Sequence, residues 1–223
     1  MDFRHEWKHE ITFSDRLTIR QRMRAVARSD PHAIEGKYFI RSLYFDNRED
    51  KVLREKTEGV GRREKFRIRY YNGDPSLIHL EKKSKVHGLC RKESTVLSAK
   101  EVEEIIQNGS DWIPERSDPL LLELAMKMRI QGLRAKTIVD YTREPFVYEP
   151  GNVRITIDFD IRTGLLGTDF LDPDCVTMPV PGNPILLEVK WDEFLPSVIR
   201  DAVMLEGRIA SAYSKYAACR IYG

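Results

Sequence analysis

The sequence has few of the features that mark membrane, exported or redox-active proteins. No apolar run approaches the length of a membrane-spanning helix, and residues 1–8 are too charged for the apolar part of a signal peptide. The three cysteines, Cys90, Cys175 and Cys219, lack the spacing of a metal or redox site. An odd number of cysteines without an export signal favours reduced thiols. We therefore expect a cytoplasmic protein with no membrane segment.

Familiar nucleotide-binding and hydrolase motifs are also absent. No Walker motif or dinucleotide fingerprint occurs, and no Ser/His/Asp or Cys/His set suggests a protein nucleophile. The 37 Lys and Arg residues are nearly balanced by 35 Asp and Glu, which leaves a formal net charge of +2. Such a chain attracts nucleic acid weakly over long distances, so we expect no nucleic acid partner. Affinity for an anion must come from where the charges lie.

The sequence does contain a series of short alternating segments, which favours a mainly β (α+β) fold in a single domain, residues 1–223. Strands are predicted over residues 1–8, 38–46, 64–71, 77–85, 91–96, 136–144, 152–162 and 185–191. Helices are predicted after an N-cap at Ser14, over 98–108, 118–131 and 196–216, and a short helix or loop over 47–57.

The charged residues follow the strand period. In residues 64–71, Lys65, Arg67 and Arg69 fall on one face and apolar side chains on the other. For one strand, a polar face in water would explain this pattern. From residue 62 to 92, however, ten basic residues stand against three acidic ones, and like charges opposite one another destabilise a sheet. A closed barrel with apolar rows outside and charged rows facing a lumen, filled by a polyanion, accounts for both observations.

Carboxylates recur on the same charged rows. They are Glu6, Glu81, Asp158, Asp160 and Glu188. They would repel phosphate unless a divalent cation lies between, and hard oxygen ligands select Mg²⁺ or Mn²⁺. Asp158 and Asp160 could be a metal pair or could be salt-bridged to the basic lumen, and the sequence leaves both open.

Several short motifs, taken together and in order, resemble a known family. They are Arg4-x-Glu6-x-Lys8, Lys65-x-Arg67-x-Arg69, Glu81-x-Lys83, Asp140-Tyr141-x-Arg143, Arg154-x-Thr156-x-Asp158, Glu188-x-Lys190 and Ser214-Lys215-Tyr216. This set resembles the VTC domain, the polyphosphate polymerase branch of the CYTH-like triphosphate tunnel metalloenzymes. The resemblance implies an eight-stranded antiparallel β-barrel tunnel that binds the triphosphate of ATP. It also implies transfer of the γ-phosphoryl group to inorganic polyphosphate with Mn²⁺ or Mg²⁺.

By the same resemblance, specific residues receive roles. The phosphate ligands in catalysis would be Lys8, Arg67, Arg69, Lys83, Arg143, Arg154 and Lys190, and further phosphate contacts would be Arg4, Lys65, Lys85, Tyr141, Ser214 and Lys215. Glu188, and with it Glu6, would hold the metal. Arg4 stands where the superfamily signature has a Glu, which favours holding phosphate over two-metal hydrolysis.

Three functions are therefore weighed. The first is a metal-dependent polyphosphate polymerase. The second is a hydrolase of the same fold that acts on inorganic triphosphate or nucleoside triphosphates. The third is a module that holds polyphosphate without turning it over.

Overall fold

The described residues form one antiparallel sheet of ten strands. The computed structural model describes residues 4–205, 207 and 213–221. All paired strands run antiparallel, which confirms the predicted mainly antiparallel β fold with flanking helices. The strands are β1 (His5–Ile11), β2 (Arg28–Ser29), β3 (Tyr38–Asp46), β4 (Arg62–Tyr71), β5 (Asp74–Val86), β6 (Leu89–Leu97), β7 (Arg134–Tyr148), β8 (Val153–Thr163), β9 (Met178–Pro179) and β10 (Ile185–Trp191).

The sheet curves strongly but does not close. Its order is β1-β10-β8-β7-β3-β4-β5-β6, with β2 added to β7 and β9 to β8. Within the described residues, one isolated bridge joins the edge strands β1 and β6, where the amides of Arg4 and Cys90 donate to each other's carbonyls at 3.1 and 3.3 Å. Lys83 Nζ meets Glu6 Oε2 at 2.7 Å beside it. Among the described residues, this bridge and an ion pair from β1 to β5 stand where a closed barrel needs a full ladder of backbone hydrogen bonds, and the predicted closure is wrong.

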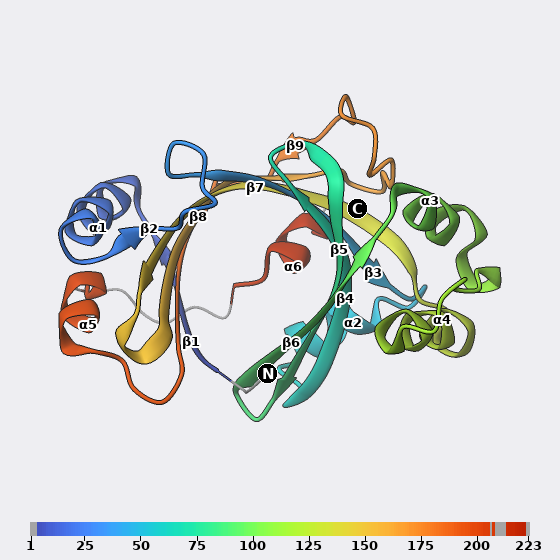
Figure 1. Ribbon diagram of the computed structural model, residues 1–223, viewed down its shortest axis with the longest axis horizontal. Coiled ribbons are helices and arrows are strands. Elements are labelled where there is room, and N and C mark those ends of the chain that lie inside the picture. Colours follow the sequence, from blue (N-terminus) through green and yellow to red (C-terminus); the bar gives the residue numbers. More distant parts are fainter. Residues whose placement is uncertain (1–3, 206, 208–212, 222–223) are drawn as a thin grey trace.

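Four helices cover the outer, apolar face of this sheet: α1 (Phe13–Val26), α3 (Ala99–Asn108), α4 (Pro119–Gln131) and α5 (Ser197–Val203). Two others, α2 (Lys51–Thr57) and α6 (Lys215–Cys219), pack on the inner side with Tyr44. Short 3₁₀ turns lie at Gly109–Asp111 and Pro150–Asn152. Helices α3 and α4 lie on one side and α1 and α5 on the other (Figure 1). Ile68 and Leu80 pack with Leu124 of α4, and Ile155 packs with Ile19 of α1. Because the apolar rows are buried outward, the charged rows face inward.

The helix starts follow local capping chemistry. The prediction of Ser14 as an N-cap is wrong, because Thr12, two residues earlier, is the N-cap and forms a complete capping box with Asp15. Thr12 Oγ1 accepts from the Asp15 amide at 3.2 Å, and the Asp15 carboxylate accepts from the Thr12 amide at 2.9 Å. Ser98 and Asp118, where two helices are predicted to start, cap those helices. In the described part of the chain, no helix combines the length and apolar character needed to cross a membrane.

The single helix predicted over residues 196–216 is wrong. The described residues of this segment form α5, a non-helical stretch, and then α6, whose N-cap is Ser214; residues 206 and 208–212 lie outside the described residues. Gly207 has φ +69°, which is left-handed and interrupts a helix. Instead of covering the outside, α6 projects into the concave face of the sheet (Figure 1).

Candidate functional site

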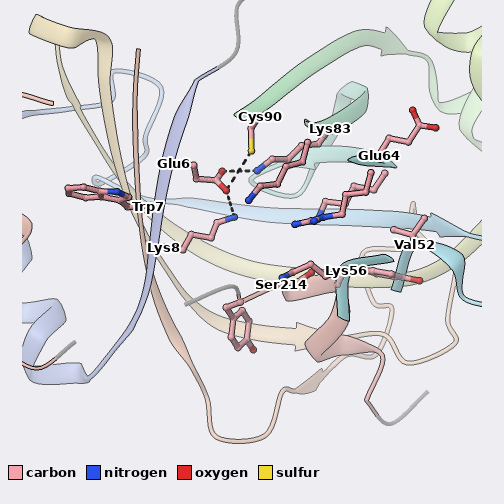
Figure 2. Close-up of a pocket in the computed structure, with 14 residues that line it drawn as sticks. Glu6, Trp7, Lys8, Val52, Lys56, Glu64, Lys83, Cys90 and Ser214 are labelled. Atoms are coloured by element: carbon pink, nitrogen blue, oxygen red, sulfur yellow. Dashed lines mark hydrogen bonds and ion pairs between the residues drawn. The ribbon is translucent and has the colours of Figure 1, made fainter. Parts of the chain in front are cut away.

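The concave face of the sheet encloses a cavity of about 470 Å³. Its charged lining comprises twelve basic and four acidic side chains, which are Arg4, Lys8, Lys65, Arg67, Arg69, Lys83, Arg91, Lys92, Arg143, Arg154, Lys190, Lys215, Glu6, Glu81, Glu188 and Asp192. A second cavity, of about 340 Å³, shares five lining residues with it and is drawn in Figure 2. We call the two adjoining cavities the basic tunnel. A chain with a net charge of only +2 thus concentrates positive charge in its interior.

Strand register explains how the tunnel gathers its cations. Lys65 of β4 lies directly opposite Lys83 of β5, and Lys83 lies opposite Lys92 of β6. Two residues further along β4, Arg67 lies opposite Glu81. Alternate side chains of a strand point to the same face, so a row of cations crosses three strands. Like charges in register oppose sheet formation, and this row therefore needs counter-charge.

Two carboxylates supply part of that counter-charge between β1 and β10. Lys8 Nζ lies 2.8 Å from Glu6 Oε1 and 3.0 Å from Glu188 Oε2. Lys190 Nζ lies 2.5 Å from Glu188 Oε1, and Lys83 reaches Glu6 (Figure 2). Burial and the neighbouring Glu188 oppose ionisation of Glu6, but the three lysines lower its pKa to about 2. Both carboxylates are therefore ionised at neutral pH.

Glu81 organises the cations on the opposite wall. Its Oε2 lies 2.6 Å from Arg67 Nη2 and 3.6 Å from Arg69 Nη1, and its Oε1 lies 3.1 Å from Lys92 Nζ. Burial alone would raise the pKa of Glu81, but Arg67, Arg69 and Lys92 hold it well below its usual range. A single buried carboxylate thus fixes two guanidinium groups that face the tunnel.

Hydroxyl groups complete the orientation of Arg69. Its Nε donates to Ser42 Oγ at 2.9 Å, and its Nη2 donates to Tyr141 Oη at 2.9 Å. Tyr141 was predicted to support the phosphate ligands, and its hydroxyl lies against one of them. Because the Arg69 side chain is held from two sides, its guanidinium is preoriented for an anion.

Asp158 lies behind the lining and holds two further cations. Its carboxylate accepts from Arg143 Nε and Nη2 at 2.6 and 2.8 Å, and Lys215 Nζ of α6 lies 2.5 Å away. Burial opposes ionisation, but Arg143 and Lys215 lower the pKa of Asp158 to about 2. Asp160 is exposed, with φ +50°. Of the two readings left open, the structure favours salt-bridging: Asp158 is ion-paired, and Asp160 does not join it as a metal pair.

The ends of the tunnel differ. At one end Arg4 Nε pairs with Asp192 Oδ1 at 2.6 Å, and Arg154 Nη2 pairs with Asp30 Oδ2 at 3.0 Å and donates to the Tyr38 hydroxyl. At the other end the second cavity is lined by Lys56, Arg63, Lys85 and Ser214. Both cavities carry carboxylates, because Asp192 lines the first and Glu64 lines the second.

The predicted site residues come together from seven segments of the chain. Thirteen of the fifteen line the larger cavity, namely Arg4, Glu6, Lys8, Lys65, Arg67, Arg69, Lys83, Tyr141, Arg143, Arg154, Glu188, Lys190 and Lys215. The other two, Lys85 and Ser214, line the second cavity, where Ser214 caps α6. Their roles toward a substrate remain predictions.

Two residues that face the tunnel received no role from the sequence. Tyr44 is buried, lines the larger cavity and accepts a hydrogen bond from Arg67. Thr156, opposite Glu188, has a buried hydroxyl that lacks a hydrogen-bond partner in the described structure. Strand alternation put both on the inner face, but neither residue is charged, so the charge pattern gave no reason to select them.

Glu6 and Glu188 are the residues that could hold a divalent cation. Their carboxylate oxygens converge on one ammonium group, that of Lys8, so a cation could occupy the same place. No cluster of three His, Cys, Asp or Glu side chains suited to a metal occurs in the described ranges. Two carboxylates fit Mg²⁺ when phosphate oxygens and water complete the coordination. The donor set therefore fits a cation that arrives with a phosphate ligand.

A known protein family matches almost the whole chain. A family model described as the VTC domain matches residues 3–221. No curated protein matches the chain. Among solved structures, a candidate adenylate cyclase from Bacillus halodurans is 14% identical, with 85% of this chain and 80% of that chain covered and a TM-score of 0.49. A Pyrococcus horikoshii protein is 15% identical, with 90% and 84% covered and a TM-score of 0.44. A candidate adenylate cyclase from Vibrio parahaemolyticus is 10% identical, with 90% and 82% covered and a TM-score of 0.47.

Proposed function

Because the chain belongs to the VTC domain family, we propose that it is a polyphosphate polymerase that transfers the γ-phosphoryl group of ATP to inorganic polyphosphate. The observation that supports this most directly is the basic tunnel, in which twelve cations face one cavity. A linear polyanion can pair with many of these cations at once, whereas a compact neutral substrate cannot. The reaction type is inferred from the family, and the polyanionic substrate is inferred from the basic lining of the tunnel.

The residues of the tunnel fall into two groups in this proposal. Arg67 and Arg69, held by Glu81, bind phosphate oxygens in bidentate fashion. Lys8 and Lys190 leave their carboxylates and pair with phosphates when these enter. Glu188 and Glu6 would hold Mg²⁺ or Mn²⁺ together with phosphate oxygens. A divalent cation bound there would neutralise charge on the phosphates.

The chemical step needs no protein nucleophile. A terminal phosphate oxygen of the acceptor chain attacks the γ-phosphorus of ATP, a new P–O–P bond forms, and the bond to the β-phosphate oxygen breaks to release ADP. The cations of Arg67, Arg69 and Arg143 stabilise the charge on the equatorial oxygens and hold the reactants in line. This agrees with a tunnel built of ion-paired cations and without a nucleophilic triad.

The test is incubation of the purified protein with ATP and Mn²⁺, followed by gel analysis of phosphate chains and measurement of ADP. We expect chains that lengthen with time and ADP in equal amount to the phosphate incorporated. Free phosphate without chains would indicate a triphosphatase, and ATP recovered intact would indicate a binding module.

Arg67→Ala should abolish turnover while the fold remains intact, and full activity in that variant would refute the assignment of the site.

A further inference from the structure

The row of three lysines across β4, β5 and β6 is compensated unevenly. Lys83 Nζ lies 2.7 Å from Glu6 Oε2, and Lys92 Nζ lies 3.1 Å from Glu81 Oε1. Lys65, directly opposite Lys83, has no ion pair with any carboxylate in the part of the chain that the structure describes. An ammonium group in such a position faces like charges without an opposite one, so its charged form is disfavoured.

A tyrosine of the adjoining strand β3 lies close to Lys65. Lys65 Nζ lies 5.1 Å from the centre of the Tyr44 ring, and Arg67 Nη1 donates to Tyr44 Oη at 2.9 Å. Tyr44 is 2% exposed and stacks on Tyr216 of α6 at 5.2 Å. A phenol that accepts from a guanidinium and lies among cations is favoured in its ionised form. The same cationic surroundings therefore favour the deprotonated form of both side chains.

The titration of the two groups is consistent with that geometry. Burial and the charges of Arg67, Lys83 and Lys8 lower the pKa of Lys65 to about 7, although Tyr44 opposes the shift. Burial opposes ionisation of Tyr44, but Arg67, Lys65 and Arg69 lower its pKa to about 7. The pair titrates as a unit: in the empty tunnel it is an amine with a phenol, or an ammonium with a phenolate, one proton short of its fully protonated form.

We propose that Lys65 and Tyr44 form a proton-accepting pair that takes up a proton from solvent when a phosphate chain enters the tunnel, so that the occupied site contains an ammonium and a phenol. Phosphate oxygens supply the negative charge that Lys65 lacks and make a phenolate at Tyr44 unfavourable. The negative charge of the phosphates therefore favours uptake of a proton by the pair, whether the empty pair is an amine with a phenol or an ammonium with a phenolate. The inference rests only on the phosphate-binding part of the proposed function. In it, protonation of Lys65 and Tyr44 raises the positive charge of the tunnel when phosphate binds.

Other charged and titratable groups also face the pair. They are Glu6 and Lys8 from β1, Arg67 and Arg69 from β4, Glu81 and Lys83 from β5, Lys56 from α2 and Tyr216 from α6. Each of the two carboxylates is already paired with lysine or arginine, and burial together with the hydrogen bond to the Asp46 carboxylate raises the pKa of Tyr216. The guanidinium groups stay protonated. Burial lowers the pKa of Lys83 and of Lys56 as well, and Lys83→Arg therefore separates that lysine from the pair.

The test is titration calorimetry of metal-free protein with inorganic tripolyphosphate at about pH 8.5, in two buffers of different ionisation enthalpy. At this pH a terminal phosphate is already ionised, so any proton taken up on binding must be gained by a group of the protein. We expect uptake of roughly one proton per bound ligand, and an affinity that falls by up to about tenfold per pH unit above pH 7. Binding without proton uptake would overturn the inference.

Two matched variants assign the proton. The double variant Lys65→Arg with Tyr44→Phe keeps a permanent cation and removes the phenol, so it should bind tripolyphosphate but lose the uptake and the pH dependence. Lys83→Arg, in the same row, should retain both. Uptake unchanged in the double variant, or lost in Lys83→Arg alone, would contradict the assignment. Failure to bind tripolyphosphate would overturn the phosphate site itself, whereas binding with proton uptake but without chain growth from ATP would overturn only the polymerase.

Discussion

The Glu188 carboxylate lies between two ammonium groups and is the residue most directly linked to the divalent cation in the proposed function. Glu188→Gln keeps the shape of the side chain and removes its charge. We expect turnover of ATP to fall by at least about 100-fold, because mutation of groups at a metal site lowers affinity or activity by roughly this order. The measurement is ADP release with Mn²⁺ varied.

Glu123→Gln is a matched control for that variant. Glu123 lies on α4 at the outer face, where its Oε1 is 2.6 Å from Lys82 Nζ, so turnover should be unchanged. If Glu188→Gln were as active as this control, the carboxylate would have no part in binding the metal.

Asp158 gives a pH-dependent contribution to folding. Its pKa is about 2 in the folded protein because of Arg143 and Lys215, and 3.8 is the ordinary value. A group with a lowered folded pKa stabilises the protein above its unfolded pKa and loses that contribution as the pH falls toward its folded one. We expect roughly 2 kcal/mol of unfolding free energy to be lost between about pH 4 and pH 2.

Asp158→Asn tests this contribution by urea unfolding at several pH values. The variant leaves two cations without their buried partner, so at pH 7 it should be less stable by roughly 3–5 kcal/mol. Its stability should also change less than that of the wild type between pH 4 and pH 2. An identical pH profile in the two proteins would show that Asp158 is not the group that titrates.

Single residues also show what the sequence could and could not predict. Alternation placed Lys65, Arg67 and Arg69 on one face without any knowledge of the fold, because side-chain direction in a strand has a period of two. The partners of those cations could not be predicted. Glu81 is 14 residues from Arg67, and the pairing depends on register, which an isolated sequence pattern does not determine. Tyr44 was missed because it carries no formal charge.

At the scale of elements, α6 positions Lys215 inside the tunnel. The helix has five residues, too few to be stable by itself, and is held by the hydrogen bond from Tyr216 Oη to Asp46 Oδ2 at 2.7 Å. Tyr216→Phe removes this bond and should cost roughly 1.5–3 kcal/mol. Because Lys215 is the adjacent residue, we also expect the dissociation constant for tripolyphosphate to rise severalfold.

Ser98→Ala is the control at this scale. It removes the cap of α3, outside the tunnel, and should cost roughly 0.5–2 kcal/mol without weakening tripolyphosphate binding. Thermal unfolding and calorimetry on both variants separate the two effects. Equal binding in both would show that α6 does not depend on its tether to position Lys215.

The elements that the sequence predicted well are those with a local signal. The alternating segments became strands, and Ser98 and Asp118 cap helices where expected. The prediction of one helix over residues 196–216 is wrong although its apolar residues suit a continuous helix. Gly207 has φ +69°, and the end of the segment packs into the concave face. That docking surface is made by distant strands, so local periodicity could not reveal it.

At the scale of the whole molecule, the open edge of the sheet is where the tunnel can respond to its ligand. The central strands β3, β4 and β7 are each paired on both sides, whereas among the residues that the structure describes β1 and β6 meet through one bridge, between Arg4 and Cys90. Backbone amides at a weakly paired edge open more readily than those inside a sheet. We therefore expect amide hydrogen exchange to be faster in β1 and β6 than in β3 and β7.

A bound phosphate chain should reduce this difference in exchange rate between the edge strands and the central strands. Lys8 of β1 and Lys92 of β6 line the same cavity, so an anion that contacts both connects the two edges by charge where few backbone hydrogen bonds do. With tripolyphosphate bound, exchange in β1 and β6 should slow by about tenfold or more, the equivalent of roughly 1.4 kcal/mol, while exchange in β7 changes little. Slowing confined to β7, or none at the edges of a protein that binds the ligand, would mean that the chain contacts one wall of the tunnel and does not bridge the open seam.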